Sequence, residues 1–418
     1  MNFKNWRRWV RSKPWSLKWF IILVLLRPLI DNFYFLKEIS PLLSPLYWAG
    51  VLTPILCLQP VVRFRYKKNL LHRLFNIWAG LIIINVVCLI FQKIALILLI
   101  EWILRLSLPV FLFLFLRVFI RNMTDFKGLL TTFLYSAGLA ALMLLYELLV
   151  NPIQIEYSRG IERISGGYAD VMNYAIYLSF GFLILAYFYI SYKITRQGFK
   201  VRLPLLVAAG IFCMAGYIGI SHTASYAVFA ALIILFIAFI ARKYVILSVV
   251  LIGILWIGIS IFGGKFYRER INPLVEKEVE VIQGEREEGQ LFHGRMARWQ
   301  YAWGNFKDSP VTAWLFGYPT SLEDPLFNIS IGIHNDYLRI FYLTGISGLF
   351  VYVLFLFNLW RRKKFLYLAE KFLLYGSLAV LLLYSVSTTP TFYANFLYIL
   401  FSIFAYFSLP PSQLIQHE

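Results

Sequence analysis

The residues best suited to chemistry are histidines that fall between, or at the ends of, long apolar segments. His222, His293 and His334 each occupy such a place. Histidine is the side chain whose ordinary pKa allows acid–base work near neutral pH. Three histidines could also bind a metal, but the H-x-x-x-H and H-E-x-x-H spacings of zinc sites are absent. We therefore expect an acid–base role or an ordinary surface role, and no metal site.

Two arginines, Arg295 and Arg298, fall in a segment with the period of an amphipathic helix. Its large apolar residues recur in steps of 4, 3, 4 and 3, at Phe292, Met296, Trp299, Trp303 and Phe306. We expect this face to lie on the protein or in the lipid headgroups, with the two arginines on other faces. At that height a guanidinium could meet a lipid-linked phosphate. Ordinary snorkelling arginines are the alternative.

The elements that must position these residues are membrane spans. Of the 418 residues, 60% are hydrophobic and 15% are charged, whereas a soluble domain has roughly a quarter charged. A span needs about 20 mostly apolar residues. We therefore predict an all-α polytopic membrane protein with about twelve transmembrane helices, near 16–37, 41–62, 75–92, 95–120, 128–150, 171–192, 203–221, 223–241, 244–262, 336–358, 367–388 and 390–409.

The distribution of basic residues predicts the orientation of these spans. Of the 40 Lys and Arg residues, 22 lie in six connections that fall on one side if twelve spans alternate. Basic connections stay in the cytoplasm. Both termini are therefore expected to be cytoplasmic, and the first span is expected to remain in the protein because no signal-peptide cleavage site follows it. This pattern also argues against nucleic acid as the partner of a chain with net charge +19.

Two long connections are then predicted on the outer side, at 151–170 and 263–335. Long loops in compact proteins usually have a function. We predict an N-terminal transmembrane bundle of nine spans (1–262), a large outer loop (263–335) and a C-terminal bundle of three spans (336–418). The predicted amphipathic helix lies in the large outer loop.

Charged residues also occur inside the predicted spans. Arg27 and Asp31 in the first span, and Glu101 and Arg105 in the fourth, are spaced i, i+4, so each pair can meet on one helix face. Intramembrane charges usually face the bundle interior. Structural pairing is the interpretation we favour, and a proton or ion pathway is the alternative.

Nucleotide-dependent chemistry has no visible place in this chain. A P-loop and a Gly-rich dinucleotide motif are both absent. We therefore expect no cofactor, and a substrate that comes from the membrane or from outside.

The motifs on the predicted outer side resemble those of the O-antigen ligase and O-antigen polymerase superfamily. In HNDYLRIFYLTGISG, which starts at His334, the likeness is a His followed by Asn or Ser, an apolar run and a G-x-x-G. Upstream, GRMARWQYAWGNFKDSPVTAWLFGYP is similar to the family's Gly-Arg, Trp, Ser-Pro and later Gly. These are Gly294, Arg295, Trp299, Ser309-Pro310 and Gly317. Arg163-Ile-Ser-Gly-Gly-Tyr with Asn173 resembles an earlier outer loop, and RPLID (27–31) also fits.

The sequence departs from the family pattern at one place. Many relatives have an Arg near the outer end of the span that here begins SHTASYAVF, where this chain has His222, Thr223 and Ser225. The second cation of the family's two-arginine grip on diphosphate is then expected from Arg163 or Arg298.

The resemblance implies a metal-independent glycosyltransferase that moves a glycan from undecaprenyl diphosphate to an acceptor hydroxyl. It implies a diphosphate role for Arg295, helped by Arg163 and Arg298, and a general-base role for His334. His222 is expected as a second base or a substrate contact, and Arg159 and Asn335 as substrate contacts. The expected location is the bacterial inner membrane, with the active site facing the periplasm or cell exterior.

Three functions remain as alternatives: two enzymes that differ in their acceptor, and a transporter. A polymerase adds repeat units of a cell-surface polysaccharide, and the missing arginine favours this interpretation slightly. A ligase moves the finished glycan to lipid A core. A transporter of lipid-linked glycan would instead place its key polar groups near the midplane in repeated halves. Membrane lipid, the carrier-linked glycan, the acceptor glycan or lipid A core, and a flippase or chain-length regulator are the expected partners.

Overall fold

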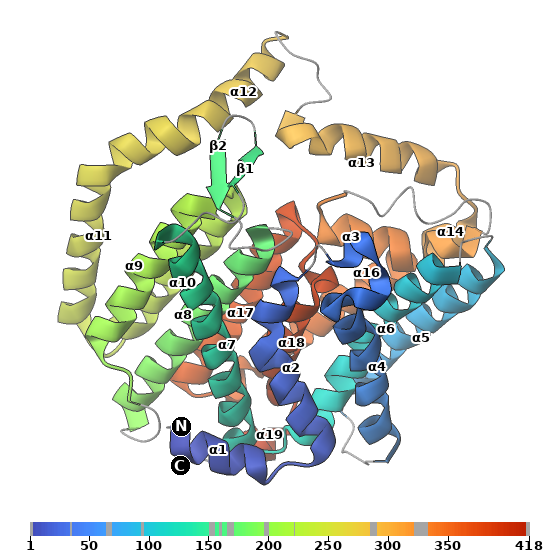
Figure 1. The fold of residues 1–418 in the computed structure, drawn as a ribbon, viewed down its shortest axis with the longest axis horizontal. Helices are drawn as coiled ribbons and strands as arrows, with labels where there is room; N and C mark the ends of the chain where they lie inside the picture. The colour runs from blue at the N-terminus through green and yellow to red at the C-terminus, as the bar shows by residue number, and fades with distance from the viewer. Residues whose placement is uncertain are drawn as a thin grey trace.

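The computed structural model describes residues 3–33, 36–63, 69–92, 96–149, 155–158, 161–164, 171–195, 200–220, 222–284, 291–321 and 333–414. These residues fold into a bundle of long helices that are inclined to one another to different degrees (Figure 1). The long helices are α2 (Trp15–Asn32), α4 (Pro45–Arg63), α5 (Leu70–Phe91), α6 (Leu96–Phe119), α7 (Met123–Leu149), α8 (Val171–Thr195), α9 (Leu203–Ile220), α10 (Thr223–Ala241), α11 (Val245–Phe266), α16 (Asp336–Arg361), α17 (Leu368–Ser387) and α18 (Ala394–Phe407).

Each of the twelve apolar segments predicted from the sequence falls on one of these helices, so the all-α polytopic class is confirmed. In the described part of the chain, eight helices are long and apolar enough to cross a membrane. A ninth candidate, α11, is bent by 54° close to its C-terminal end. Helix α18 and the apolar stretch Pro45–Leu58 of α4 are shorter, and α2 contains Lys18, Arg27 and Asp31. The number of twelve spans therefore stays a prediction.

Shorter elements gather at the two ends of the bundle. At one end, α1 (Phe3–Arg11) lies across the ends of the long helices, near both chain termini (Figure 1). At the opposite end lie α12 (Asn272–Ile282) and α13 (Leu291–Lys307) (Figure 1). The other short elements are α3 (Leu36–Ile39), η1 (Pro41–Leu43), the π-helical turn η2 (Tyr267–Ile271), α14 (Val311–Phe316), η4 (Tyr318–Ser321), η5 (Arg362–Phe365), η6 (Pro390–Phe392) and α19 (Pro411–Leu414).

The outer connection 151–170 contains a β-hairpin, which the all-helical prediction missed. Strands β1 (Ile155–Ser158) and β2 (Ile161–Ile164) pair antiparallel, with Glu156 opposite Arg163. The residues Ile-Glu-Tyr and Ile-Glu-Arg-Ile alternate between apolar and charged, which is the period of a strand. The hairpin lies at the same end of the bundle as α12 and α13 (Figure 1).

The interior of the bundle is built around α8, α17 and α18. Of the apolar window of α8, 94% is buried, and every residue of α18 from Asn395 to Phe407 is buried. Helix α11 is the opposite case, because side chains on all its faces are exposed, such as Ile246, Trp256 and Ile261. A helix that is apolar all round and exposed all round suits contact with lipid.

Candidate functional site

His334 lies in a short segment that leads into α16. Its side chain is exposed, and its backbone has φ 47°, in the left-handed region that non-glycine residues rarely adopt. The preceding residue, Ile333, is 2% exposed, and its carbonyl accepts a 2.7 Å hydrogen bond from Trp299 Nε1 of α13. The residue before His334 is therefore hydrogen-bonded to the amphipathic helix.

The residue after His334, Asn335, is hydrogen-bonded to helices α16 and α17. Asn335 is the N-cap of α16, and its Oδ1 accepts a 3.0 Å hydrogen bond from the Leu338 backbone N–H. Its Nδ2 donates to the carbonyl of Val386 at 3.4 Å. The side chain that the sequence assigned to a substrate contact is therefore engaged in holding the backbone beside His334.

Asp336 extends this anchor to the connection between α17 and α18. Its carboxylate is fully buried and accepts hydrogen bonds from the Thr391 hydroxyl (2.7 Å) and the Thr391 backbone N–H (3.2 Å). Arg339 Nη1 lies 3.9 Å from the same carboxylate, and its Cζ lies 3.4 Å from the centre of the Phe392 ring. Because a buried charge is tolerated only when paired and hydrogen-bonded, this cluster holds α16 against η6.

The amphipathic helix predicted in the outer loop is confirmed as α13. Phe306 is fully buried and Trp299 is packed against a small second core, which also includes residues of α14, η4 and α16. Trp303 is 48% exposed and meets Trp314 edge-on at 5.6 Å. The aromatic face of α13 thus rests mainly on the protein.

The two arginines of α13 differ in their surroundings. The sequence placed both away from the aromatic face, which is wrong for Arg295: Arg298 is exposed, but Arg295 is half-buried. Arg295 precedes Trp299 by four residues and therefore lies on nearly the same side of the helix, roughly 6 Å back along its axis. The Trp299–Ile333 bond therefore links the His334 segment to the helix that carries Arg295, one turn away from Arg295.

Two glycines of the resemblance motifs fit against each other beneath α13. A Cβ on Gly317 (φ 103°) would lie 2.2 Å from the carbonyl oxygen of Leu343, and one on Gly345 (φ 66°) would lie 2.3 Å from the carbonyl carbon of Leu315. Gly345 also breaks the regular helical backbone of α16. These positions need glycine both for the close backbone approach and for the positive φ.

Asn85 of α5 and Gln92, the residue just after α5, were missed by the sequence analysis and hold the same segment. Asn85 Nδ2 donates to the carbonyl of Phe316 at 2.9 Å, and Gln92 Nε2 donates to the carbonyl of Pro319 at 3.2 Å. Both side chains are buried. The signal in the sequence was that Asn85 is a polar residue inside a predicted span, where polar side chains usually face the bundle interior.

The remaining predicted site residues lie on other elements. His222 precedes α10, is half-buried, and its Nδ1 lies 3.4 Å from the hydroxyl of Ser225. Arg163 is in β2 at the register position opposite Glu156. Arg159 lies outside the described residues, as do the side chains of Arg163 and His293.

The pairing predicted for Arg27 and Asp31 in the first long helix is confirmed. Arg27 Nε donates to Asp31 Oδ1 at 2.6 Å, with both side chains buried. The guanidinium also lies 5.8 Å from the centre of the Tyr398 ring. The side chains of Glu101 and Arg105 lie outside the described ones.

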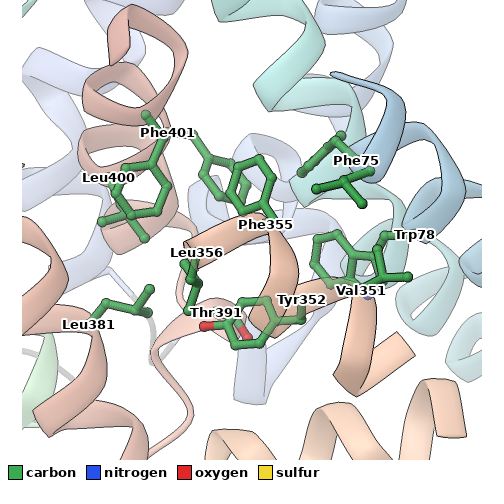
Figure 2. Close-up of a pocket in the computed structure, with 12 residues that line it drawn as sticks. Phe75, Trp78, Val351, Tyr352, Phe355, Leu356, Leu381, Thr391, Leu400 and Phe401 are labelled. Atoms are coloured by element: carbon green, nitrogen blue, oxygen red, sulfur yellow. The ribbon is translucent and has the colours of Figure 1, made fainter. Parts of the chain in front are cut away.

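A small cavity lies on the inner side of the Asp336 anchor. Figure 2 shows Thr391 and Tyr352 at one end of it and Phe75, Trp78 and Phe355 on its walls. It has room for roughly one water-sized sphere, about 10 Å³. Its lining has no cation, so its chemistry does not suit a diphosphate, and we regard it as a packing defect among α5, α16 and α18.

Comparison with known proteins identifies a family that part of the chain matches. No curated protein matches the chain. Residues 207–353 match the model of the O-antigen ligase family. The matched range runs from α9 into α16 and includes His222, Arg295, Arg298, His334 and Asn335, but not Arg159 or Arg163. This match supports membership of the chain in the O-antigen ligase and polymerase superfamily of membrane glycan-processing enzymes.

Proposed function

We propose that this protein is a metal-independent glycosyltransferase that polymerises undecaprenyl-diphosphate-linked repeat units of a cell-surface polysaccharide. The reaction would take place at the outer face of the bacterial inner membrane. The observation that carries the proposal is the His334 segment: an exposed histidine on a left-handed backbone, anchored on both sides. A residue keeps a strained backbone conformation only where surrounding contacts hold it there, and such residues cluster at functional sites.

In this proposal His334 acts as the general base. Its imidazole would accept the proton of the acceptor hydroxyl as that oxygen attacks the anomeric carbon of the carrier-linked sugar. The anomeric carbon–oxygen bond then breaks, and the electron pair leaves on the lipid diphosphate. An exposed side chain is accessible to such an acceptor, while the bonds at Ile333 and Asn335 limit its movement.

Arg295 is proposed to stabilise the charge that develops on the leaving diphosphate. A guanidinium stays charged and matches phosphate oxygens in a fixed geometry. Its half-buried position, one turn from Trp299, supports the assignment over that of the exposed Arg298. Arg298, Arg163, Arg159 and His222 are proposed as further substrate contacts. Asn335 is better explained as an anchor of the segment than as a ligand.

The orientation and the domain division are part of the same proposal. The end with α12, α13 and the hairpin would face the periplasm, and the end with α1 and the termini would face the cytoplasm, where the basic connections belong. Residues 263–335 would carry the diphosphate site between the two transmembrane parts, 1–262 and 336–418. A flippase or a chain-length regulator would be a natural partner.

A ligase is the second candidate, because the matching family is described as O-antigen ligase. The test is a reconstitution of the purified protein in vesicles with carrier-linked repeat units, without nucleotide or added metal. A ladder of lengthening lipid-linked glycans is the expected result. Transfer that occurs only after lipid A core is added would instead identify a ligase. No transfer to either acceptor would contradict the proposal and favour a transporter.

A further inference from the structure

Helix α1 is held rigidly on the end of the bundle where the termini lie. Trp6 Nε1 donates to Thr132 Oγ1 at 3.0 Å, and Trp9 Nε1 donates to Asp125 Oδ1 at 3.2 Å. Both tryptophans are buried, with 8% and 6% of their surface exposed. Gly128 makes room for Trp9, because a Cβ there would lie 2.4 Å from the indole ring. The aromatic face of α1 is therefore occupied by α7 and not by lipid.

The opposite side of α1 presents positive charge. Lys4, Arg7, Arg8 and Arg11 are all exposed. Within the described residues, none of the ion pairs found involves any of the four. The nearby acidic side chain, Asp125, already accepts from Lys13 Nζ at 2.5 Å as well as from Trp9. Within the described residues these cations are therefore available to an anionic partner.

The start of α2 indicates the level of this charge relative to the lipid headgroups. Trp15 and Trp19 are 62% and 45% exposed and stack edge to face at 5.8 Å. Exposed tryptophans at the end of an apolar helix mark the level of the lipid headgroups. Since α1 ends at Arg11 and α2 begins at Trp15, the cationic face of α1 lies at that level.

We propose that α1 is a fixed docking surface for anionic phospholipid headgroups of the inner leaflet. The phosphates would neutralise Lys4, Arg7, Arg8 and Arg11, while the tryptophans keep the helix parallel to the membrane. Basic segments next to a membrane are attracted to anionic lipid in this way. The headgroup height favours lipid over an acidic protein as the partner. This surface is at the opposite end of the bundle from the His334 segment (Figure 1) and does not depend on the proposed reaction.

The test uses native mass spectrometry of the full-length protein in detergent. Dioleoyl phosphatidylglycerol and dioleoyl phosphatidylcholine are titrated separately onto the wild type and onto the triple variant Arg7→Gln, Arg8→Gln, Arg11→Gln. Each cation near an anionic surface strengthens binding roughly fivefold, so the variant should bind phosphatidylglycerol on the order of a hundredfold more weakly. Its binding of phosphatidylcholine should be unchanged.

The matched control is Arg242→Gln, Lys243→Gln, Lys364→Gln, which removes three other exposed cations from the basic connections. The control should keep the wild-type preference for phosphatidylglycerol, and thermal unfolding should verify that both variants are folded. Equal loss in the two variants would contradict the proposal, because it would indicate diffuse charge. A wild type that does not distinguish the two lipids would also contradict it, and binding of poly-glutamate in that case would indicate an acidic protein partner.

Discussion

At the scale of single residues, burial separates two arginines that look equivalent in the sequence. Arg295 and Arg298 lie three residues apart on α13, but one is half-buried and the other is exposed. A partly desolvated cation acts on a developing charge more strongly than one surrounded by water, because the local dielectric is lower. The diphosphate role therefore belongs to Arg295 in our account.

We expect Arg295→Ala to lower kcat for glycan transfer by roughly 100- to 1,000-fold, the usual effect of removing one group that stabilises a developing oxyanion. Arg298→Ala should have a much smaller effect, mainly on KM, because its exposed guanidinium is proposed to help bind the substrate and not to stabilise the developing charge. Both constants can be measured with reconstituted protein and carrier-linked repeat units. Equal losses of kcat in the two variants would disprove the distinction.

At the scale of elements, the segment α14–η4 depends on backbone contacts that leave no room for side chains. The segment α14–η4 is tied to α5 by Asn85 and Gln92 and fits against the α16 backbone at Gly317 and Gly345. The second small core and helix α13 rest on this segment. Loss of the glycine contact should therefore disturb the whole outer part of the site.

Gly317→Ala is expected to destabilise the protein and to abolish transfer, because its Cβ would overlap the Leu343 carbonyl and its φ of 103° strains any L-residue. Gly304→Ala is the matched control on α13, where a Cβ would meet nothing within 4 Å. That change should leave stability equal or slightly higher, because Ala favours helix. Thermal unfolding in detergent measures both. Similar unfolding temperatures for the two variants would contradict this account of the loop.

Thr391→Val tests the anchor between α16 and η6. Valine keeps the shape of the side chain in the small apolar cavity but removes the 2.7 Å hydrogen bond to Asp336. We expect a loss of about 1–3 kcal/mol in stability. We also expect a lower kcat with little change in KM, because the His334 segment would be less well held.

The control for this anchor is Ser377→Ala, which removes a fully buried hydroxyl that bonds to the Leu373 carbonyl within α17. It should change stability less and leave kcat unaltered. If Thr391→Val lowers stability without changing kcat, the Asp336 cluster is a structural contact only and does not position His334.

At the scale of the whole molecule, the account requires α1 and α13 to lie on opposite sides of the membrane. In a cysteine-free variant, single cysteines at Arg8 and Lys307, both exposed, would report the side on which each helix lies. A membrane-impermeant maleimide added to intact spheroplasts should label the residue-307 cysteine and not the residue-8 cysteine. Labelling of both or neither would contradict the predicted topology.

Local patterns predicted much of this fold, but contacts between distant segments could not be predicted. Hydropathy was sufficient to predict all twelve long helices, and the spacing of Trp299 and Phe306 was sufficient to predict α13. The bond between Asp336 and Thr391 joins residues 55 positions apart, and nothing in either local sequence identifies the partner. Likewise, the motif glycines were visible one by one, but their mutual contact needs the folded backbone.

The measurement that tests the central claim most directly is the transfer rate of His334→Asn beside wild type in reconstituted vesicles. Asparagine tolerates the left-handed backbone at this position, so the segment should keep its conformation and the protein its thermal stability. It cannot serve as a general base, so we predict a loss of transfer of at least about 100-fold. A stable His334→Asn protein that transfers glycan at the wild-type rate would contradict the assignment of the chemistry to His334.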